Sequence, residues 1–328
     1  MHKKVSARYA QIIGITCALA AAAFFVPSIF AQGEPSAAPA PPSVPVVSHD
    51  PPRALRLMAH VPKPKLKSNA KFDFSSITAT SVYVVDVASR AVLLEYNAEV
   101  LHPLASITKL MTACVALDHS VPLSKKMAVI ADDEVGGARL KVNVGTKLSV
   151  KDLLSVALIG SANNTANALA RSTHLSREAF LAEMNTKAKK FGLEQTMFTE
   201  PTGIDTANVS TAKDIAALGL EAFAFPDIRR ATTTARYVVS LASGVRTVKN
   251  TNGLLTNERN GLYVLGGKTG YLVESQWNLV VKMRDARAHP IEVVVLGSEN
   301  QNQSFRDAEI VARWVWAHYA WSSKTSSR

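Results

Sequence analysis

The chain has 328 residues, of which 47% are hydrophobic, and a formal net charge of +11 at pH 7. This length and composition allow a sizeable buried core and exclude a disordered or fibrous protein. The chain has two cysteines, and it contains neither a paired-cysteine motif nor a His-Glu-x-x-His helix. We therefore expect no metal site and no cofactor.

The N-terminus has the pattern of an export signal. Three basic residues within the first eight precede an apolar run from Ile12 to Phe30 that contains no acidic residue. A charged segment followed by an apolar one is typical of secretory signals. We predict that residues 1–31 form this signal and that the protein is exported to the periplasm or cell envelope. The run is marginal for a membrane span, and an uncleaved signal would tether the protein through residues 9–31.

Residues 32–75 are rich in proline and alanine, a composition that favours extended chains and predicts a linker. Without the signal the chain keeps a net charge of +8. An exported basic protein meets anionic wall polymers and membrane-surface head groups rather than nucleic acid. Because lysine and arginine are spread along the chain, diffuse solubilising charge explains the excess equally well.

The folded domain is predicted to span residues 76–320, followed by a tail at 321–328. Ser149, Ser176 and Thr211 have the positions of helix-capping residues in its helical middle. β-rich segments lie on both sides of that middle, and an apolar helical pattern closes the domain. This order predicts an α+β fold, with one antiparallel sheet assembled from both chain ends and a helical insert. The predicted strands are 81–87, 91–96, 263–265, 277–283 and 291–296, and the predicted helices are 150–159, 176–191, a helix after Thr211, and 305–319.

The first candidate for catalysis is a serine followed three residues later by a lysine. Ser106 precedes an apolar helical pattern, and Lys109 shares its helix face because residues i and i+3 are neighbours. A lysine can remove a serine proton near neutral pH once burial lowers its pKa. A helix N-terminus supplies N–H groups near the developing oxyanion. The spacing therefore predicts Ser106 as the nucleophile and Lys109 as its base.

Ser-x-x-Lys alone is weak evidence, because the chain also contains it at Ser68–Lys71 and Ser210–Lys213. Standing alone, each copy is better explained by a capping serine and a surface lysine. Two further motifs follow Ser106, however: Ser161-Ala-Asn163 and Lys268-Thr-Gly270. The order Ser-x-x-Lys, Ser-x-Asn, Lys-Thr-Gly is the signature of penicillin-recognising serine enzymes.

With these motifs, longer segments resemble the low-molecular-mass penicillin-binding proteins, the D-alanyl-D-alanine carboxypeptidase and endopeptidase family. The resemblance implies a β-lactamase/transpeptidase-like fold and a serine peptidase that acts on peptidoglycan stem peptides and is acylated by β-lactams. The chain is most similar to the D-alanyl-D-alanine endopeptidase branch (penicillin-binding protein 7), since it ends about 60 residues after Lys268. By this analogy we expect cleavage of D-Ala-diaminopimelate crosslinks rather than carboxypeptidase action. The resemblance covers residues 76–320 and is carried by Ala105–Ala113, Phe198–Ile204, Asn208–Asp214 and Asn250–Leu255.

The resemblance implies roles for the residues of the first two motifs. Ser106 would form the acyl-enzyme and Lys109 would accept its proton. Ser161 would relay a proton to the leaving amine. Asn163 would bind the amide backbone of the substrate or Lys109. The water that deacylates the enzyme is left without an assigned activator.

The resemblance also implies roles for the third motif. Lys268, Thr269 and Gly270 would bind the substrate, the first two at its carboxylate end. The backbone N–H groups of Ser106 and Tyr271 would form the oxyanion hole. Directly after this motif the chain departs from the usual family pattern, which places an aromatic residue or histidine before threonine and an Ala-Gly pair. The departure concerns substrate preference more than acylation.

Several residues have competing interpretations. The atypical segment Leu272–Trp277 forms part of the predicted rim of the site. His102, Arg139 and Tyr237 could line the cleft, and we interpret them as structural. Glu200 has the rough position of the glutamate that activates water in class A β-lactamases, but its sequence context matches the peptidases. We therefore predict that Glu200 caps a loop and that deacylation of penicillin is slow.

Two alternatives to a peptidase follow from the same sequence. A class A-like β-lactamase has the same motif order, and rapid penicillin turnover dependent on a glutamate would identify it. A wall-binding protein with a degenerate site would fit the predicted tether and the positive charge. The intact motifs favour an enzyme over the second alternative.

Overall fold

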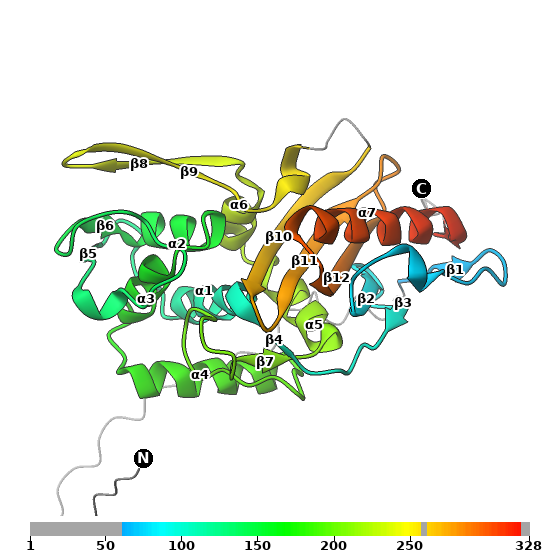
Figure 1. Ribbon diagram of the computed structural model, residues 1–328, viewed down its shortest axis with the longest axis horizontal. Helices are drawn as coiled ribbons and strands as arrows, with labels where there is room; N and C mark the ends of the chain where they lie inside the picture. The colour runs from blue at the N-terminus through cyan, green and yellow to red at the C-terminus, as the bar shows by residue number, and fades with distance from the viewer. Residues whose placement is uncertain (1–60, 257–260, 323–328) are drawn as a thin grey trace, which may run out of the picture. The chain divides into compact units, whose positions relative to one another are not determined.

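The structure is a computed structural model that describes residues 61–256 and 261–322 (Figure 1). The predicted signal and most of the predicted linker lie outside these residues. Within the described part of the linker, strand β1 (Lys65–Leu66) pairs with β13 (Tyr319–Ala320) near the other end of the chain. Phe72 and Phe74 also pack against a hydrophobic cluster of the domain. Contacts with the domain therefore begin before residue 76.

The centre of the fold is an antiparallel sheet with the strand order β10-β11-β12-β2-β3. Strands β12 and β2 pair although they come from opposite ends of the domain, which confirms the predicted assembly from both chain ends. Both are almost entirely buried, as expected for short continuous runs of apolar residues. The strands are β2 (Ser81–Asp86), β3 (Val92–Tyr96), β10 (Tyr263–Leu272), β11 (Gln276–Arg284) and β12 (Pro290–Ser298).

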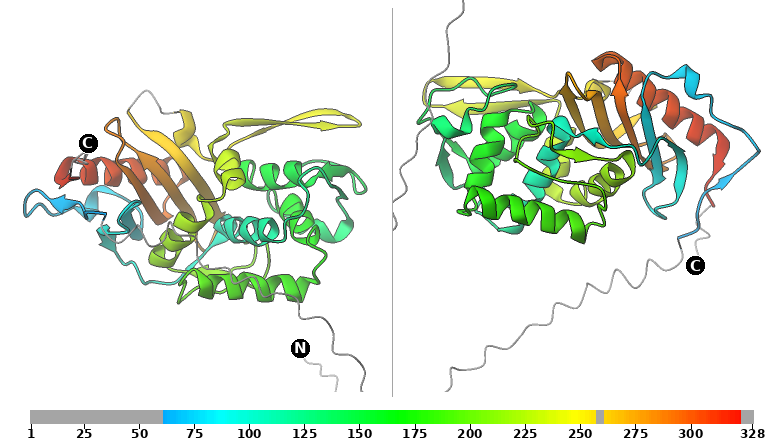
Figure 2. Two further views of the ribbon diagram at one scale, coloured as in Figure 1. Left: turned by 180° about the vertical axis from the view of Figure 1, so that it is seen from behind. Right: turned by 60° about the horizontal axis from the view of Figure 1, so that its bottom comes forward.

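Helices cover both faces of this sheet (Figure 2). Successive side chains of a strand point to opposite faces, so Val293 belongs to one hydrophobic cluster and Val294 to the other. Helix α7 (Gln301–His318) packs on the first face and α5 (Ala212–Ala222) on the second. The predicted α+β class is confirmed.

The helical insert lies beyond the β10 edge of the sheet, and its colours in Figure 1 run from turquoise at α1 through green to yellow-green at α6. As predicted, Ser149 and Ser176 cap helices: their hydroxyls accept hydrogen bonds from the N–H groups of Asp152 and Ala179. The helices of the insert are α1 (Thr108–Asp118), α2 (Val150–Ile159), α3 (Asn163–Arg171), α4 (Arg177–Lys190) and α6 (Pro226–Thr233).

Two helix starts differ in detail from the prediction. The segment Thr211-Ala-Lys-Asp214 has the sequence of a capping box, in which the two side chains cap each other's N–H groups. Thr211 does cap α5 through the N–H of Asp214, but the reciprocal bond is not formed. The Asp214 carboxylate instead accepts hydrogen bonds from the Gln195 N–H and the Thr196 hydroxyl, so a tertiary contact replaces the local one. Helix α7 begins earlier than residue 305 because Asn300 caps it.

Further short antiparallel strand pairs lie outside the central sheet. The β8–β9 hairpin lies beside α2. No helix in the described part of the chain has both the length and the apolar character needed to cross a membrane. The paired strands are β4 (His102–Pro103) with β7 (Val209–Ser210), β5 (Lys126–Ala128) with β6 (Lys147–Ser149), and β8 (Arg236–Leu241) with β9 (Gly244–Lys249).

Candidate active site

Ser106 lies where the chain enters helix α1. It belongs to a 3-10 turn, η4 (Ala105–Ile107), and one helical turn later Lys109 is 1% exposed. The distance between Lys109 Nζ and Ser106 Oγ is 2.9 Å, as the i, i+3 spacing predicts. Ala105 has a φ of +50°, and Gly203 packs so closely on its carbonyl that a Cβ would overlap it. The conformation before the serine therefore depends on a glycine from another loop.

The other neighbours of Lys109 determine how its amine is oriented. Nζ donates to Asn163 Oδ1 and to the Thr202 carbonyl oxygen, both at 2.6 Å. A neutral amine has two N–H groups and one lone pair, and these two oxygens can only accept. Both N–H groups are thus used, which leaves the lone pair for the Ser106 hydroxyl proton. The arrangement favours Lys109 as a base.

The electrostatic surroundings of Lys109 favour the same role. Burial lowers the pKa of its ammonium to about 7, and the nearby Glu200 carboxylate acts in the opposite direction. A group with a pKa near 7 is partly neutral at physiological pH and can still accept a proton. Lys109 can therefore be deprotonated without a separate base.

The Ser-x-Asn motif forms the turn between α2 and α3. Ser161 has a φ of +59°, an unusual conformation for a serine, and it is 7% exposed. Asn163 begins α3, and its Nδ2 donates to the Gly136 carbonyl at 2.8 Å. This bond directs Oδ1 of Asn163 toward Lys109. The turn thus presents one hydroxyl and one amide beside Ser106.

The Lys-Thr-Gly motif lies inside strand β10, whereas the sequence placed it after a short strand. Lys268 is 1% exposed, and its Nζ donates to Ser161 Oγ and to the Thr269 carbonyl, both at 2.8 Å. Burial, and then repulsion from Lys109, lower the pKa of Lys268 well below its usual value. An anion that bound beside Lys268 would reverse part of this shift.

The backbone around Gly270 brings β10 against the turn that carries Ser106. A Cβ at Gly270 would lie 2.9 Å from the Leu104 carbonyl oxygen and 3.4 Å from the Ser106 nitrogen, so only glycine fits without a shift. The Leu272 N–H donates to Ser275 Oγ within the β10–β11 hairpin. N–H groups of successive strand residues point to opposite sides of the strand. Because the Leu272 N–H points toward β11, the Tyr271 N–H points to the open edge of the sheet. Two N–H groups, one from each wall, can therefore meet an oxyanion.

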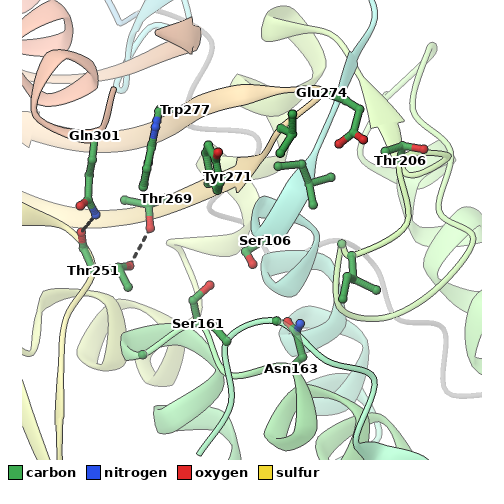
Figure 3. A pocket seen from close by; sticks show the side chains of 18 residues that line it. Ser106, Ser161, Asn163, Thr206, Thr251, Thr269, Tyr271, Glu274, Trp277 and Gln301 are labelled. Atoms are coloured by element: carbon green, nitrogen blue, oxygen red, sulfur yellow. Dashed lines mark hydrogen bonds between the residues drawn. The ribbon is translucent and has the colours of Figure 1, made fainter. Parts of the chain in front are cut away.

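These groups enclose a cleft of about 650 Å³ (Figure 3). Ser106 lies near its middle, between Ser161 and Asn163 on the helical side and Thr269 and Tyr271 on the strand side. The structure thus brings together all the residues that the three motifs predicted, with both lysines buried behind the lining.

Other lining residues carried no predicted role. Thr251 Oγ1 lies 2.6 Å from Thr269 Oγ1, and Gln301 Nε2 donates to the Thr251 carbonyl at 3.3 Å. Ile204 and Thr206 line the cleft from another loop. Thr251 and Ile204 belong to segments that carried the family resemblance. Membership of these segments was the one feature of the sequence that could have predicted their place in the cleft.

Glu200 has the loop-capping geometry that the sequence predicted. It is 5% exposed, and its carboxylate accepts hydrogen bonds from the N–H and hydroxyl of Thr202, at 2.7 and 2.6 Å. The same carboxylate also binds the Gly203 N–H and, at 2.6 Å, Asn208 Nδ2. Both oxygens are thus used in holding the loop that contacts Lys109 and Ala105. Glu200 is not among the described residues that line the cleft.

The three residues interpreted as structural also lie outside the lining. His102 Nε2 lies 2.9 Å from Ser81 Oγ. The Tyr237 hydroxyl donates to Asp152 at 2.8 Å, which joins the β8–β9 hairpin to α2. Arg139 forms an exposed ion pair with Glu134. His102 and Tyr237 therefore connect separate elements, whereas Arg139 pairs within its own loop.

Comparison with known proteins gives a consistent result. The model of peptidase family S11, described as D-alanyl-D-alanine carboxypeptidase, matches residues 66–300. The chain is 34% identical over 243 residues to a D-alanyl-D-alanine endopeptidase of Pseudomonas aeruginosa, covering 73% of this chain and 77% of that protein. It is 31% identical over 243 residues to a D-alanyl-D-alanine endopeptidase of Escherichia coli, with the same two coverages.

Solved structures show the same architecture. The crystal structure of the Streptomyces K15 DD-transpeptidase superposes with a TM-score of 0.67 at 27% identity, over 74% of this chain and 98% of that chain. Penicillin binding protein 5 from Haemophilus influenzae superposes with a TM-score of 0.69 at 23% identity, over 76% of this chain and 73% of that chain. The predicted β-lactamase/transpeptidase-like fold is confirmed.

Proposed function

The chain belongs to the D-alanyl-D-alanine carboxypeptidase family of serine peptidases, and we propose that it cuts peptidoglycan stem peptides through an acyl-enzyme on Ser106. Its class, a serine D-Ala-D-Ala peptidase, follows from the family. The observation that best supports the proposed nucleophile is the 2.9 Å contact between Ser106 Oγ and a buried lysine whose other two neighbours can only accept hydrogen bonds.

The proposed acylation makes an ester bond to Ser106, breaks the amide bond and moves protons through Lys109, Ser161 and Lys268. Lys109 Nζ takes the Ser106 hydroxyl proton while Oγ attacks the carbonyl carbon of the penultimate D-Ala. The N–H groups of Ser106 and Tyr271 bind the oxyanion. The C–N bond then breaks, and the Ser161 hydroxyl gives a proton to the leaving amine and is reprotonated from Lys268 Nζ. Water then attacks the ester carbonyl and gives one proton through Ser161 to the neutral Lys268, while Lys109 returns its proton to Ser106 Oγ as the ester bond breaks, so both lysines and both serines are restored.

The proposed preference is for crosslinks between stem peptides, that is, endopeptidase action on the bond from D-Ala to diaminopimelate. It is supported by the relatives at 34% and 31% identity, both of which are named D-alanyl-D-alanine endopeptidases. A crosslink and a terminal D-Ala both carry a carboxylate next to the cleaved amide. Lys268 and Thr269 would bind that carboxylate in either case, which is why the same acyl-enzyme serves both substrates.

The proposal includes acylation by β-lactams and slow release of the product. A β-lactam presents a reactive carbonyl and a carboxylate, the two groups that the cleft would bind. Both oxygens of Glu200 accept hydrogen bonds from the loop, so this glutamate is not free to activate a deacylating water. This favours a penicillin-binding peptidase over a class A-like β-lactamase.

The proposed location is the periplasm or cell envelope. The predicted signal at residues 1–31 supports export, and peptidoglycan lies outside the inner membrane. Residues 9–31 would tether the protein to a membrane surface if the signal stayed attached.

The test uses the full-length chain with a fluorescent penicillin, beside Ser106→Ala and a matched control, Ser210→Ala, from a second Ser-x-x-Lys sequence. We expect a stable label on the wild type and on the control, and none on Ser106→Ala. Crosslinked muropeptide dimers and pentapeptide monomers are then compared as substrates. Trimmed monomers with intact dimers would reject the endopeptidase preference, and an unlabelled wild type would favour a wall-binding protein.

A further inference from the structure

The charged groups of the cleft are distributed unevenly along its length. Among the described residues that line it, Glu274 is the single one with a charged side chain. It lies on the β10–β11 turn, within the segment that departs from the family pattern. Glu274 is exposed and forms no ion pair with another described residue. Its carboxylate is therefore available to a ligand.

The opposite end of the cleft has a different chemistry. There Thr269 and Thr251 share a hydrogen bond of 2.6 Å, Gln301 lies beside them, and the buried Lys268 lies behind. Figure 3 shows Thr251 and Gln301 on one side of Ser106 and Glu274 on the other. This end carries a cation and hydroxyl groups, which suit a carboxylate.

The distance between the two ends limits what can bridge them. From Thr269 to Leu272 the strand rises about 10 Å, at about 3.3 Å per residue. Leu272 and Val273, which directly precede Glu274 in the chain, line the cleft with apolar side chains. A ligand that reached Glu274 from Ser106 would thus pass apolar surface and end at a carboxylate. An aliphatic side chain with an ammonium group at its tip has this character.

We propose that Glu274 and the apolar residues beside it form a subsite for the side chain of a diamino acid on the acyl-donor side of the scissile bond, with the Glu274 carboxylate pairing with the side-chain ammonium group. This rests on the proposed function, which puts the substrate carboxylate at the Lys268 end. The acyl part of the stem peptide then extends from Ser106 in the other direction, toward Glu274. The residue that precedes D-Ala places its side chain at this subsite.

The test compares two peptides that differ in one charge. Nα-acetyl-Lys-D-Ala-D-Ala has a free side-chain ammonium, and the second peptide has that amine acetylated. For the full-length wild type we measure kcat/KM and the protection of Ser106 from fluorescent penicillin by each peptide. We expect about a fivefold preference for the free ammonium, as for a partly screened ion pair, and a smaller preference in 0.5 M NaCl.

Two variants separate a specific contact from a general effect of charge. Glu274→Gln should bring the preference to about one, while Glu194→Gln, an exposed glutamate outside the cleft, should keep it. Penicillin labelling of Glu194→Gln should match that of the wild type. An equal response to both peptides in the wild type, or a preference that survives Glu274→Gln, would overturn the subsite alone. Absence of penicillin labelling in the wild type would overturn the proposed function and, with it, the subsite.

Discussion

The cleft has a helical wall, formed by the helical insert, and a strand wall, formed by β10. Each wall contains a buried lysine bonded to a serine, yet the two lysines have different surroundings. On the helical wall, Lys109 donates to two acceptors and lies near the Glu200 carboxylate. On the strand wall, Lys268 contacts Ser161 and one carbonyl, and no described carboxylate pairs with it. Burial lowers the pKa of both. The partners, rather than the residue type, therefore distinguish the two walls.

This difference indicates two tasks. The orientation of the Lys109 amine leaves its lone pair to the serine, which suits proton transfer. Lys268 lacks an anionic partner inside the protein, so a substrate carboxylate would supply one and raise its pKa. The helical wall would then set the rate of the chemical step, and the strand wall would set binding and position.

The largest expected effect comes from Lys109→Met, which removes the base but keeps much of the buried volume. Acylation by penicillin should slow about 1000-fold, a typical loss for a proton-transfer group. Lys213→Met is the matched control, because Lys213 also follows a Ser-x-x spacing but is exposed and pairs with Glu99. Stopped-flow labelling measures both rates. If Lys109→Met stayed within tenfold of the wild type, the proposed base would be wrong.

The next effect tests how closely the walls must approach. Gly270→Ala places a methyl group 2.9 Å from the Leu104 carbonyl oxygen, so β10 or the Ser106 turn must move. A displacement near 1 Å can cost about 100-fold in rate, and we expect that loss in kcat/KM. Gly219→Ala is the control, since its Cβ would overlap the buried Glu292 side chain far from the cleft. If both variants lost the same activity, the loss in Gly270→Ala would be explained by general destabilisation of the fold.

The helical wall was largely predictable because its geometry is local. A serine and lysine three residues apart must share a helix face, and the capping serines of α2 and α4 mark helix starts. The alternation of side chains in β2 and β12 likewise follows from strand geometry. The distribution of strands at both chain ends was sufficient to predict the sheet.

The remaining features depend on tertiary contacts that have no local pattern. The Thr202 carbonyl that orients Lys109 is a backbone group, which any residue would supply. Gln301 and Glu274 reach the cleft from elements that lie on either side of β11 in the sequence. The Asp214 carboxylate had a local partner available and bound the Gln195 N–H instead. In each case the fold, rather than the spacing, selects the contact.

A moderate effect is expected on the strand wall. Lys268→Met removes the cation proposed for the substrate carboxylate, so kcat/KM for a pentapeptide should fall about 30-fold, as for a lost charge-assisted hydrogen bond. The same peptide with a C-terminal amide should be cleaved poorly by the wild type and lose little further activity in the variant. Lys249→Met, an exposed lysine on β9, is the control. Equal losses with both peptides would exclude carboxylate recognition by Lys268.

The smallest effect concerns the electrostatic link between Glu200 and Lys109, measured as a pH profile of penicillin acylation. With a Lys109 pKa of about 7, the neutral base is lost as pH falls, so the rate should drop about tenfold per pH unit below that value. The Glu200 carboxylate favours the protonated lysine and raises its pKa. Glu200→Gln should therefore move the acid limb to lower pH, while the loss of charged hydrogen bonds costs about 1 kcal/mol of stability.

Deacylation distinguishes this electrostatic role from a catalytic one. If Glu200 only holds its loop and biases Lys109, the lifetime of the penicilloyl-enzyme should change little in Glu200→Gln. Asp205→Asn, an exposed carboxylate on the same loop, should leave both the pH profile and the lifetime as in the wild type. A much longer lifetime in Glu200→Gln would instead show that the glutamate activates water, as in a class A β-lactamase. If the acid limb did not move, the charge of Glu200 would have no effect on the pKa of Lys109.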